Sequence, residues 1–109
     1  MPDLQFYIKR NDLSPGLVMS LSPLDTILTG ASVVFNMKSR QESTLKISRS
    51  SATIVTETVT PTVKYEWQPG DTDTEGFYDA EFEVTYSDGT VETFPNRGFI
   101  TVIISPDLG

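Results

Sequence analysis

Apolar and polar residues alternate along most of this chain with a period of two, which is the pattern of β-strands that bury one face. The longest such stretch places apolar residues at every second position from Tyr78 to Tyr86. The positions between them include the carboxylates Asp79, Glu81 and Glu83. This stretch predicts a long strand with one buried face and one acidic, solvated face.

Further strands are expected wherever the same alternation or a β-branched run is bounded by turn residues. In the segment around Leu45, that residue and Ile47 share one phase of the alternation. The other expected strands are Leu4 to Ile8, Leu17 to Leu21, Ala31 to Lys38, Thr53 to Val59, Val63 to Trp67, Val91 to Phe94, and Phe99 to Ile104. No segment has a helical period, so the sequence predicts a single all-β domain spanning residues 1–109.

An acidic corner, Asp71 to Ala80, joins two of the expected strands. In immunoglobulin-type sandwiches a tyrosine near the start of strand F hydrogen-bonds to the backbone a few residues upstream, two positions before a conserved cysteine. Tyr78 has the position of that tyrosine, and Ala80 stands where the cysteine would be. The pattern therefore predicts an immunoglobulin-like antiparallel β-sandwich of seven to nine strands, with a tyrosine corner and no disulfide.

The composition excludes several classes of site. The 109 residues include no cysteine and no histidine, so disulfides, thiolate metal sites and a serine triad of the usual kind cannot form. The formal net charge of −7 argues against nucleic-acid binding, which depends on Lys and Arg contacts to phosphates. No apolar run is long enough for a membrane span, and Met1 to Gln5 lack the features of a signal peptide, so synthesis in the cytoplasm is expected.

The acidic corner invites comparison with a calcium loop. Asp71, Asp73 and Glu75 followed by Gly76 match the opening of an EF-hand, but the twelfth position, which needs a glutamate, is Phe82. A calcium site at the end of the sandwich, with help from Asp79, is the alternative to carboxylates that accept backbone hydrogen bonds. The second interpretation is favoured, and no metal or other cofactor is expected.

The acidic strand face also allows a catalytic interpretation. Paired carboxylates can hydrolyse glycosidic bonds, but they must face each other across a cleft. Successive same-face positions on one strand do not provide that geometry. A solvated face that discourages aggregation is favoured, and no enzyme activity is expected.

The aromatic residues fall into two groups. Tyr65 and Trp67 have the inward phase of their strand and are expected in the core. Phe77 is out of phase with Tyr78, and Phe94 and Phe99 flank a Pro-Asn-Arg-Gly interruption. These three phenylalanines are therefore candidates for a partner surface. Together with the loop Asn11 to Gly16, the predicted partner-binding residues are Phe94, Pro95, Phe99, Phe77 and Asp12.

Several short motifs resemble a group of small bacteriophage proteins. This group includes the immunoglobulin-like N-terminal domain of the phage baseplate upper protein and stand-alone tail or virion-associated relatives. The motifs that carry the likeness are Phe6-Tyr7-Ile8-Lys9-Arg10-Asn11-Asp12-Leu13-Ser14-Pro15, Leu28 to Met37, Tyr65-Glu66-Trp67, Asp71-Thr72, Gly76 to Phe82, and Phe94-Pro95-Asn96.

The resemblance implies a non-catalytic structural role in a virion, exercised by docking to other virion proteins and to copies of the chain itself. It carries over motif positions and no binding site. The baseplate protein continues into further segments that bind its partners, whereas the chain ends at Gly109, so an adaptor or decoration role stays open beside docking to the tail centre. The alternative class is a carbohydrate-binding or host-adhesion module.

Overall fold

The computed structural model describes residues 4–21, 27–58 and 60–108, and within these ranges it contains strands and no helix, hence none that could span a membrane. Val59 and Met1 to Asp3, which the sequence predictions touch, lie outside the described residues. The prediction of an all-β chain is confirmed. The nine strands are β1 (Leu4–Lys9), β2 (Leu17–Ser20), β3 (Ser32–Ser39), β4 (Leu45–Ser51), β5 (Thr53–Thr56), β6 (Thr62–Tyr65), β7 (Gly76–Thr85), β8 (Val91–Phe94) and β9 (Ile100–Ser105).

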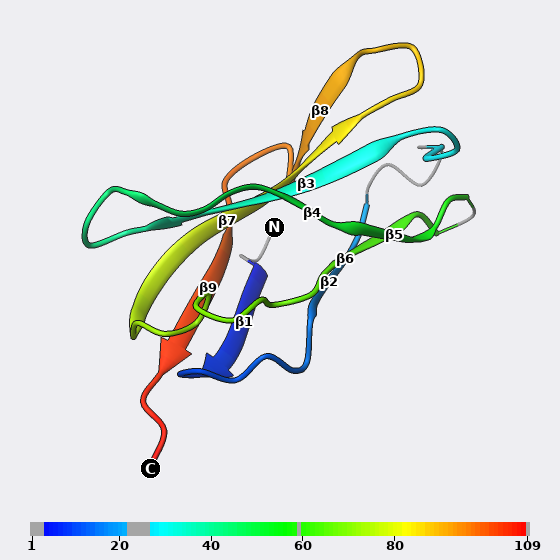
Figure 1. The fold of residues 1–109 in the computed structure, drawn as a ribbon. Coiled ribbons are helices and arrows are strands. Elements are labelled where there is room, and N and C mark those ends of the chain that lie inside the picture. The colour runs from blue at the N-terminus through cyan, green and yellow to red at the C-terminus, as the bar shows by residue number, and fades with distance from the viewer. Residues whose placement is uncertain (1–3, 22–26, 59, 109) are drawn as a thin grey trace.

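The strands form two sheets that pack as a sandwich (Figure 1). The large sheet has the order β1-β9-β7-β3-β4, with β8 also paired to β7, and the small sheet has the order β2-β6-β5. In immunoglobulin terms, β9, β7, β3 and β4 correspond to strands G, F, C and C′, and β2, β6 and β5 to B, E and D. The prediction of a β-sandwich of seven to nine strands is confirmed.

One strand pair differs from the antiparallel prediction. β1 lies parallel to β9, in a register that runs from Leu4 opposite Ile100 to Lys9 opposite Ser105, whereas every other pair of described strands is antiparallel. A parallel pair cannot be joined by a tight turn and needs a long connection. Here nearly the whole chain provides that connection, because β1 is the first strand and β9 the last.

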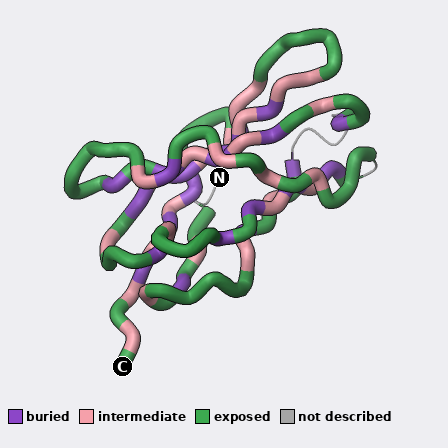
Figure 2. Tube along the Cα trace, in the orientation of Figure 1, coloured by how far each residue is buried: buried purple, intermediate pink, exposed green. Residues whose placement is uncertain are grey.

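Aromatic side chains join the two sheets in the core. The rings of Phe35 on β3 and Tyr65 on β6 stack with centroids 4.3 Å apart, and Trp67 packs edge-on against both. The Trp67 indole Nε1–H donates a hydrogen bond to the carbonyl oxygen of Pro15, at 3.1 Å. The predicted core positions of Tyr65 and Trp67 are confirmed, and Figure 2 shows the buried segments concentrated where the sheets face each other. This cluster links the sheets without a disulfide.

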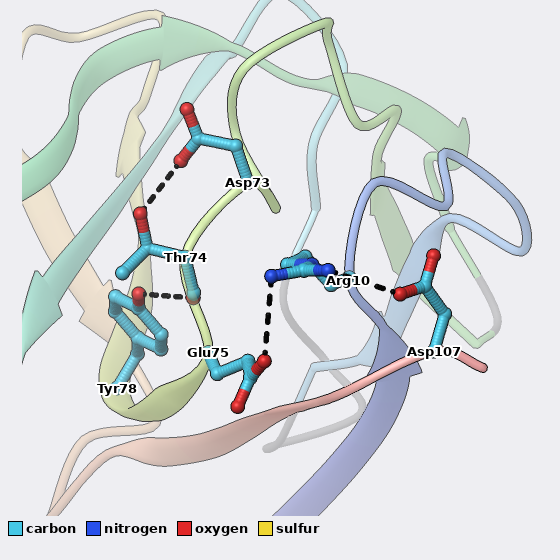
Figure 3. A network of polar contacts seen from close by, with 6 residues as sticks. All are labelled: Arg10, Asp73, Thr74, Glu75, Tyr78 and Asp107. Atoms are coloured by element: carbon cyan, nitrogen blue, oxygen red, sulfur yellow. Dashed lines mark hydrogen bonds and ion pairs between the residues drawn. The ribbon is translucent and has the colours of Figure 1, made fainter. Parts of the chain in front are cut away.

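The predicted tyrosine corner is present. The Tyr78 hydroxyl donates to the Thr74 carbonyl oxygen at 2.6 Å (Figure 3). A second tyrosine supports the same loop, because the Tyr65 hydroxyl donates to Asp71 Oδ2 at 2.6 Å, and that oxygen also accepts from the Gln68 backbone N–H. Burial, followed by the hydrogen bond to Asp71, raises the pKa of Tyr65 to about 12, so its hydroxyl keeps its proton at neutral pH.

A β-bulge changes the face on which Leu45 lies. Met37 on β3 pairs with Ile47 on β4, but the next β3 residue, Lys38, pairs with Leu45, so the β4 strand advances by two residues while β3 advances by one. Such a step turns the side chain to the opposite face of the sheet. Ile47 is therefore buried and Leu45 is 59% exposed, and the shared phase that the sequence indicates for these two residues does not hold.

The interruption expected after Phe94 lies between β8 and β9, which both pair with β7 along the same edge. Phe82 is opposite Phe94 and Ala80 is opposite Ile100, so Glu81 on β7 faces the interrupting segment and has no partner in that register. A hairpin turn joins β7 to β8, with Gly89 at a φ of 90° that only glycine adopts readily.

Candidate docking surface

Phe77 and Phe99 lie on the outer face of the large sheet, as the sequence predicts for a partner surface. Their exposed fractions are 46% and 50%, respectively. Phe77 is on β7 opposite Ile103 of β9, and Phe99 precedes β9 four positions before Ile103, in the same phase of the strand. The two phenylalanines therefore face the same way, separated by roughly 13 Å of strand.

The structure contradicts the surface position expected for Phe94. This residue is 1% exposed and pairs with Phe82, which is fully buried, so both rings point into the core. The expectation failed because the interruption begins after Phe94 and leaves that residue in register with β7. The next residue, Pro95, is half-buried.

Asp12 is exposed, but it does not join the phenylalanines in one surface. It lies beyond the Lys9 end of β1, whereas Phe99 lies beyond the Leu4 end of the same strand pair, roughly 20 Å away at 3.3 Å per residue. The Asp12 loop instead packs on the acidic corner, where the Thr72 hydroxyl donates to the Asp12 carbonyl oxygen at 2.8 Å. The prediction that the Asp12 loop and the phenylalanines form one surface is therefore wrong.

Of the two strands that flank the interruption, only β8 has an unpaired edge within the described residues. In the described part of the chain, β8 pairs only with β7, but β9 is covered on its other side by β1. Open backbone groups are therefore available along β8 and along β1, not along β9.

The outer face carries an apolar row that the sequence analysis missed. Tyr7 on β1 is opposite Ile103 on β9, which is opposite Phe77 on β7, and Tyr7 is 65% exposed. We call Tyr7, Ile103 and Phe77 the outer apolar row. A signal for this row exists in the sequence, because Tyr7 alternates with Phe6 and Ile8 and so has the outward phase of β1.

Two ion pairs frame the acidic residues of β7. Arg40 Nη2 lies 2.6 Å from Asp79 Oδ1, and Arg49 Nη1 lies 2.7 Å from Glu83 Oε1. Glu81 lies between them, and its carboxylate takes part in no hydrogen bond or ion pair within the described residues. Burial, followed by the like charge of Glu83, raises the pKa of Glu81. Two of the three carboxylates are thus neutralised by arginines, and one is not.

The carboxylates of the acidic corner are engaged with other side chains. Asp73 accepts hydrogen bonds from Lys46 Nζ and from the Thr74 hydroxyl, and these bonds hold its pKa below the ordinary value. Arg10 Nη1 lies 3.5 Å from Glu75 Oε2, and Arg10 Nη2 lies 3.2 Å from Asp107 Oδ1. Arg10 thus connects the corner to the C-terminal segment (Figure 3). Among the described residues, no group of three or more acidic side chains has the arrangement of a metal site.

Comparisons with known proteins give no family for the chain. A scan of protein-family models, a search of curated proteins and a search of solved structures each found no match. The arguments about function therefore depend on the geometry above and on the motif resemblance.

Proposed function

We propose that this domain is a non-catalytic structural component of a phage or prophage particle, in its tail, baseplate or another virion-associated position, and that it acts by docking to other virion proteins. The motif resemblance is one support. The second is the outer face of the large sheet, which displays aromatic side chains from a well-packed framework.

The observation that carries the proposal is the exposure of Phe77, Phe99 and Tyr7 on one sheet face. Single exposed apolar residues are common on protein surfaces, but several on one face mark a site of interaction. Strands fix their positions, since Tyr7 and Phe77 belong to paired strands and Phe99 directly precedes one. A rigid apolar face of this kind suits docking to a second protein, because little conformational entropy is lost when it binds.

Most residues that carry the motif resemblance support the fold. Tyr78, Asp71 and Thr72 hold the corner, and Trp67 packs in the core against Tyr65. The resemblance is therefore an argument about architecture and the class of protein, and the docking argument depends on the outer face.

The test is to locate the chain in the parent particle. Particles purified by gradient centrifugation would be probed with an antibody against the chain, by blotting and by negative-stain microscopy. The proposal predicts that the chain sediments with intact particles and that the antibody decorates one defined position. A chain found only in the unassembled fraction would contradict the proposal, and specific signals on a glycan array would favour the adhesion alternative.

A further inference from the structure

A shallow hollow of about 160 Å³ lies on the outer face of the large sheet, where β3, the start of β4, β7 and the residue before β9 meet. Its apolar sides are Leu45 and Phe99, both at least half exposed, and its acidic residues are Asp79 and Glu81. Asn36, Met37 and Lys38 complete the lining. We call this feature the Glu81 hollow.

Two irregularities of the sheet create the hollow. The bulge in β4 turns Leu45 to the outer face. Glu81 is opposite Asn36 of β3, but the interruption between β8 and β9 leaves it without a paired residue on its other side. Bulges near functional sites commonly re-aim a side chain in this way. In a regular ladder, Leu45 would be buried and Glu81 would have a paired residue on both sides.

The charge at Glu81 has no ion-pair partner in the described part of the domain. Its neighbours on the same face, Asp79 and Glu83, are paired with arginines, and Glu81 is not. Lys38 also lines the hollow but forms no ion pair with Glu81 among the described residues. Burial disfavours the charged form of Glu81 and raises its pKa. The Glu81 carboxylate is partly withdrawn from water and forms no ion pair with Lys38 or another described cation. An external cation would therefore stabilise its charge.

We propose that the Glu81 hollow binds an arginine side chain of a neighbouring protein, with the guanidinium group against Glu81 and its planar face between Phe99 and Leu45. Arginine suits the site better than lysine because guanidinium is planar, weakly hydrated and able to stack on an aromatic ring. The ligand chemistry follows from the hollow alone. Only the identification of the neighbour as a virion protein rests on the proposed function.

The first test uses N-acetylarginine amide as the probe, because its only charge is the guanidinium group. In an NMR titration of the domain, saturable shifts are expected for Glu81, Phe99 and Leu45. Glu81→Gln should weaken binding by about fivefold, the effect of losing one partly exposed ion pair. Lys38→Gln should strengthen binding, because it removes a competing positive charge from the lining.

The matched control is Glu66→Gln, which removes the same charge from an exposed position in the segment after β6. It should leave probe binding unchanged, and N-acetyllysine amide should bind the wild type more weakly than the arginine probe. Unsaturable shifts, or equal losses in Glu81→Gln and Glu66→Gln, would overturn the proposal.

The second test separates this inference from the proposed function. Glu81→Gln and Glu66→Gln chains would each compete with wild type for incorporation into particles, and only the Glu81 variant should be depleted. If no chain enters particles, the proposed function fails while the titration still decides the hollow. If wild type enters particles and Glu81→Gln enters equally well, the hollow is not a docking site in the particle.

Discussion

At the scale of single residues, the Tyr78 hydroxyl shows how one polar group holds the corner between the two sheets. Its proton is donated to the Thr74 carbonyl oxygen, and its ring is buried at 2% exposure. Removing the hydroxyl leaves that carbonyl with one partner fewer in a partly buried site. The cost is set by the loss of a hydrogen bond, not by a change of shape.

We predict that Tyr78→Phe lowers the free energy of unfolding by about 1 kcal/mol. The measurement is chemical denaturation monitored by Trp67 fluorescence. Tyr7→Phe is the matched control, because the Tyr7 ring is exposed and its hydroxyl donates a hydrogen bond to the exposed Gln5 side chain, two positions away. Equal midpoints for Tyr78→Phe and wild type would argue against a stabilising role for the corner.

Glu81 gives a second prediction at this scale. Its pKa is raised above the ordinary value of 4.5 in the folded domain, so the folded state holds the proton more tightly than the unfolded state does. Protonated Glu81 therefore stabilises the folded state at low pH. This stabilisation is lost as the pH rises above 4.5 and through the raised pKa of the folded state. Glu81→Gln should stabilise the domain at neutral pH, and the difference from wild type should shrink toward pH 4. A difference that does not vary with pH would contradict this assignment.

At the scale of strands, the local ladder decides which face of the sheet each side chain occupies. The interruption after β8 leaves Phe94 in register with buried Phe82, whereas Phe99 follows the interruption and is half exposed. The two phenylalanines are close in sequence and have opposite roles. One stabilises the core, and the other is available to a partner.

We therefore predict that two serine variants differ strongly in their free energy of unfolding. Phe94→Ser should destabilise the domain by about 3 kcal/mol or more, the usual cost of truncating a buried phenylalanine. Phe99→Ser should change the free energy of unfolding by no more than about 0.5 kcal/mol, as is typical of an exposed position. Thermal denaturation of both variants checks this, and a large loss for Phe99→Ser would place its ring in the core.

The sequence predicts those parts of the fold that follow from regular alternation. Strands such as β3 and β7, the core positions of Tyr65 and Trp67, and the tyrosine corner depend on local pattern and are correctly predicted. The exposure of Leu45, the burial of Phe94 and the parallel pairing of β1 depend on bulges and on contacts between distant segments. Alternation carries no information about these features, so the candidate surface was only partly predicted.

At the scale of the whole molecule, Asp71 and Asp73 of the acidic corner already have protein partners. Asp71 accepts from Tyr65 and Gln68, and Asp73 accepts from Lys46 and Thr74. Calcium would have to displace these donors. We predict that millimolar calcium leaves the melting temperature unchanged. A rise of several degrees that is lost when Asp71 and Asp73 are replaced by asparagine would contradict this prediction.

The outer face of the large sheet combines the outer apolar row with the Glu81 hollow, and the central claim is that this face docks the domain in a particle. Copies in a symmetric assembly need only weak individual contacts, because neighbours raise the effective concentration. Loss of one exposed aromatic ring should therefore be visible when variant and wild-type chains compete for the same positions.

The most direct measurement is such a competition. Wild type and a Phe77→Ser, Phe99→Ser double variant would be co-expressed. Mass spectrometry would then compare the ratio of the two chains in purified particles with their ratio in the lysate. Val55→Ser, at an exposed position of the small sheet, is the control. The account predicts that the double variant is folded yet depleted in particles by about fivefold or more, the effect of about 1 kcal/mol, while the control is not depleted. Equal ratios in particles and lysate for a folded double variant would contradict docking through the outer face.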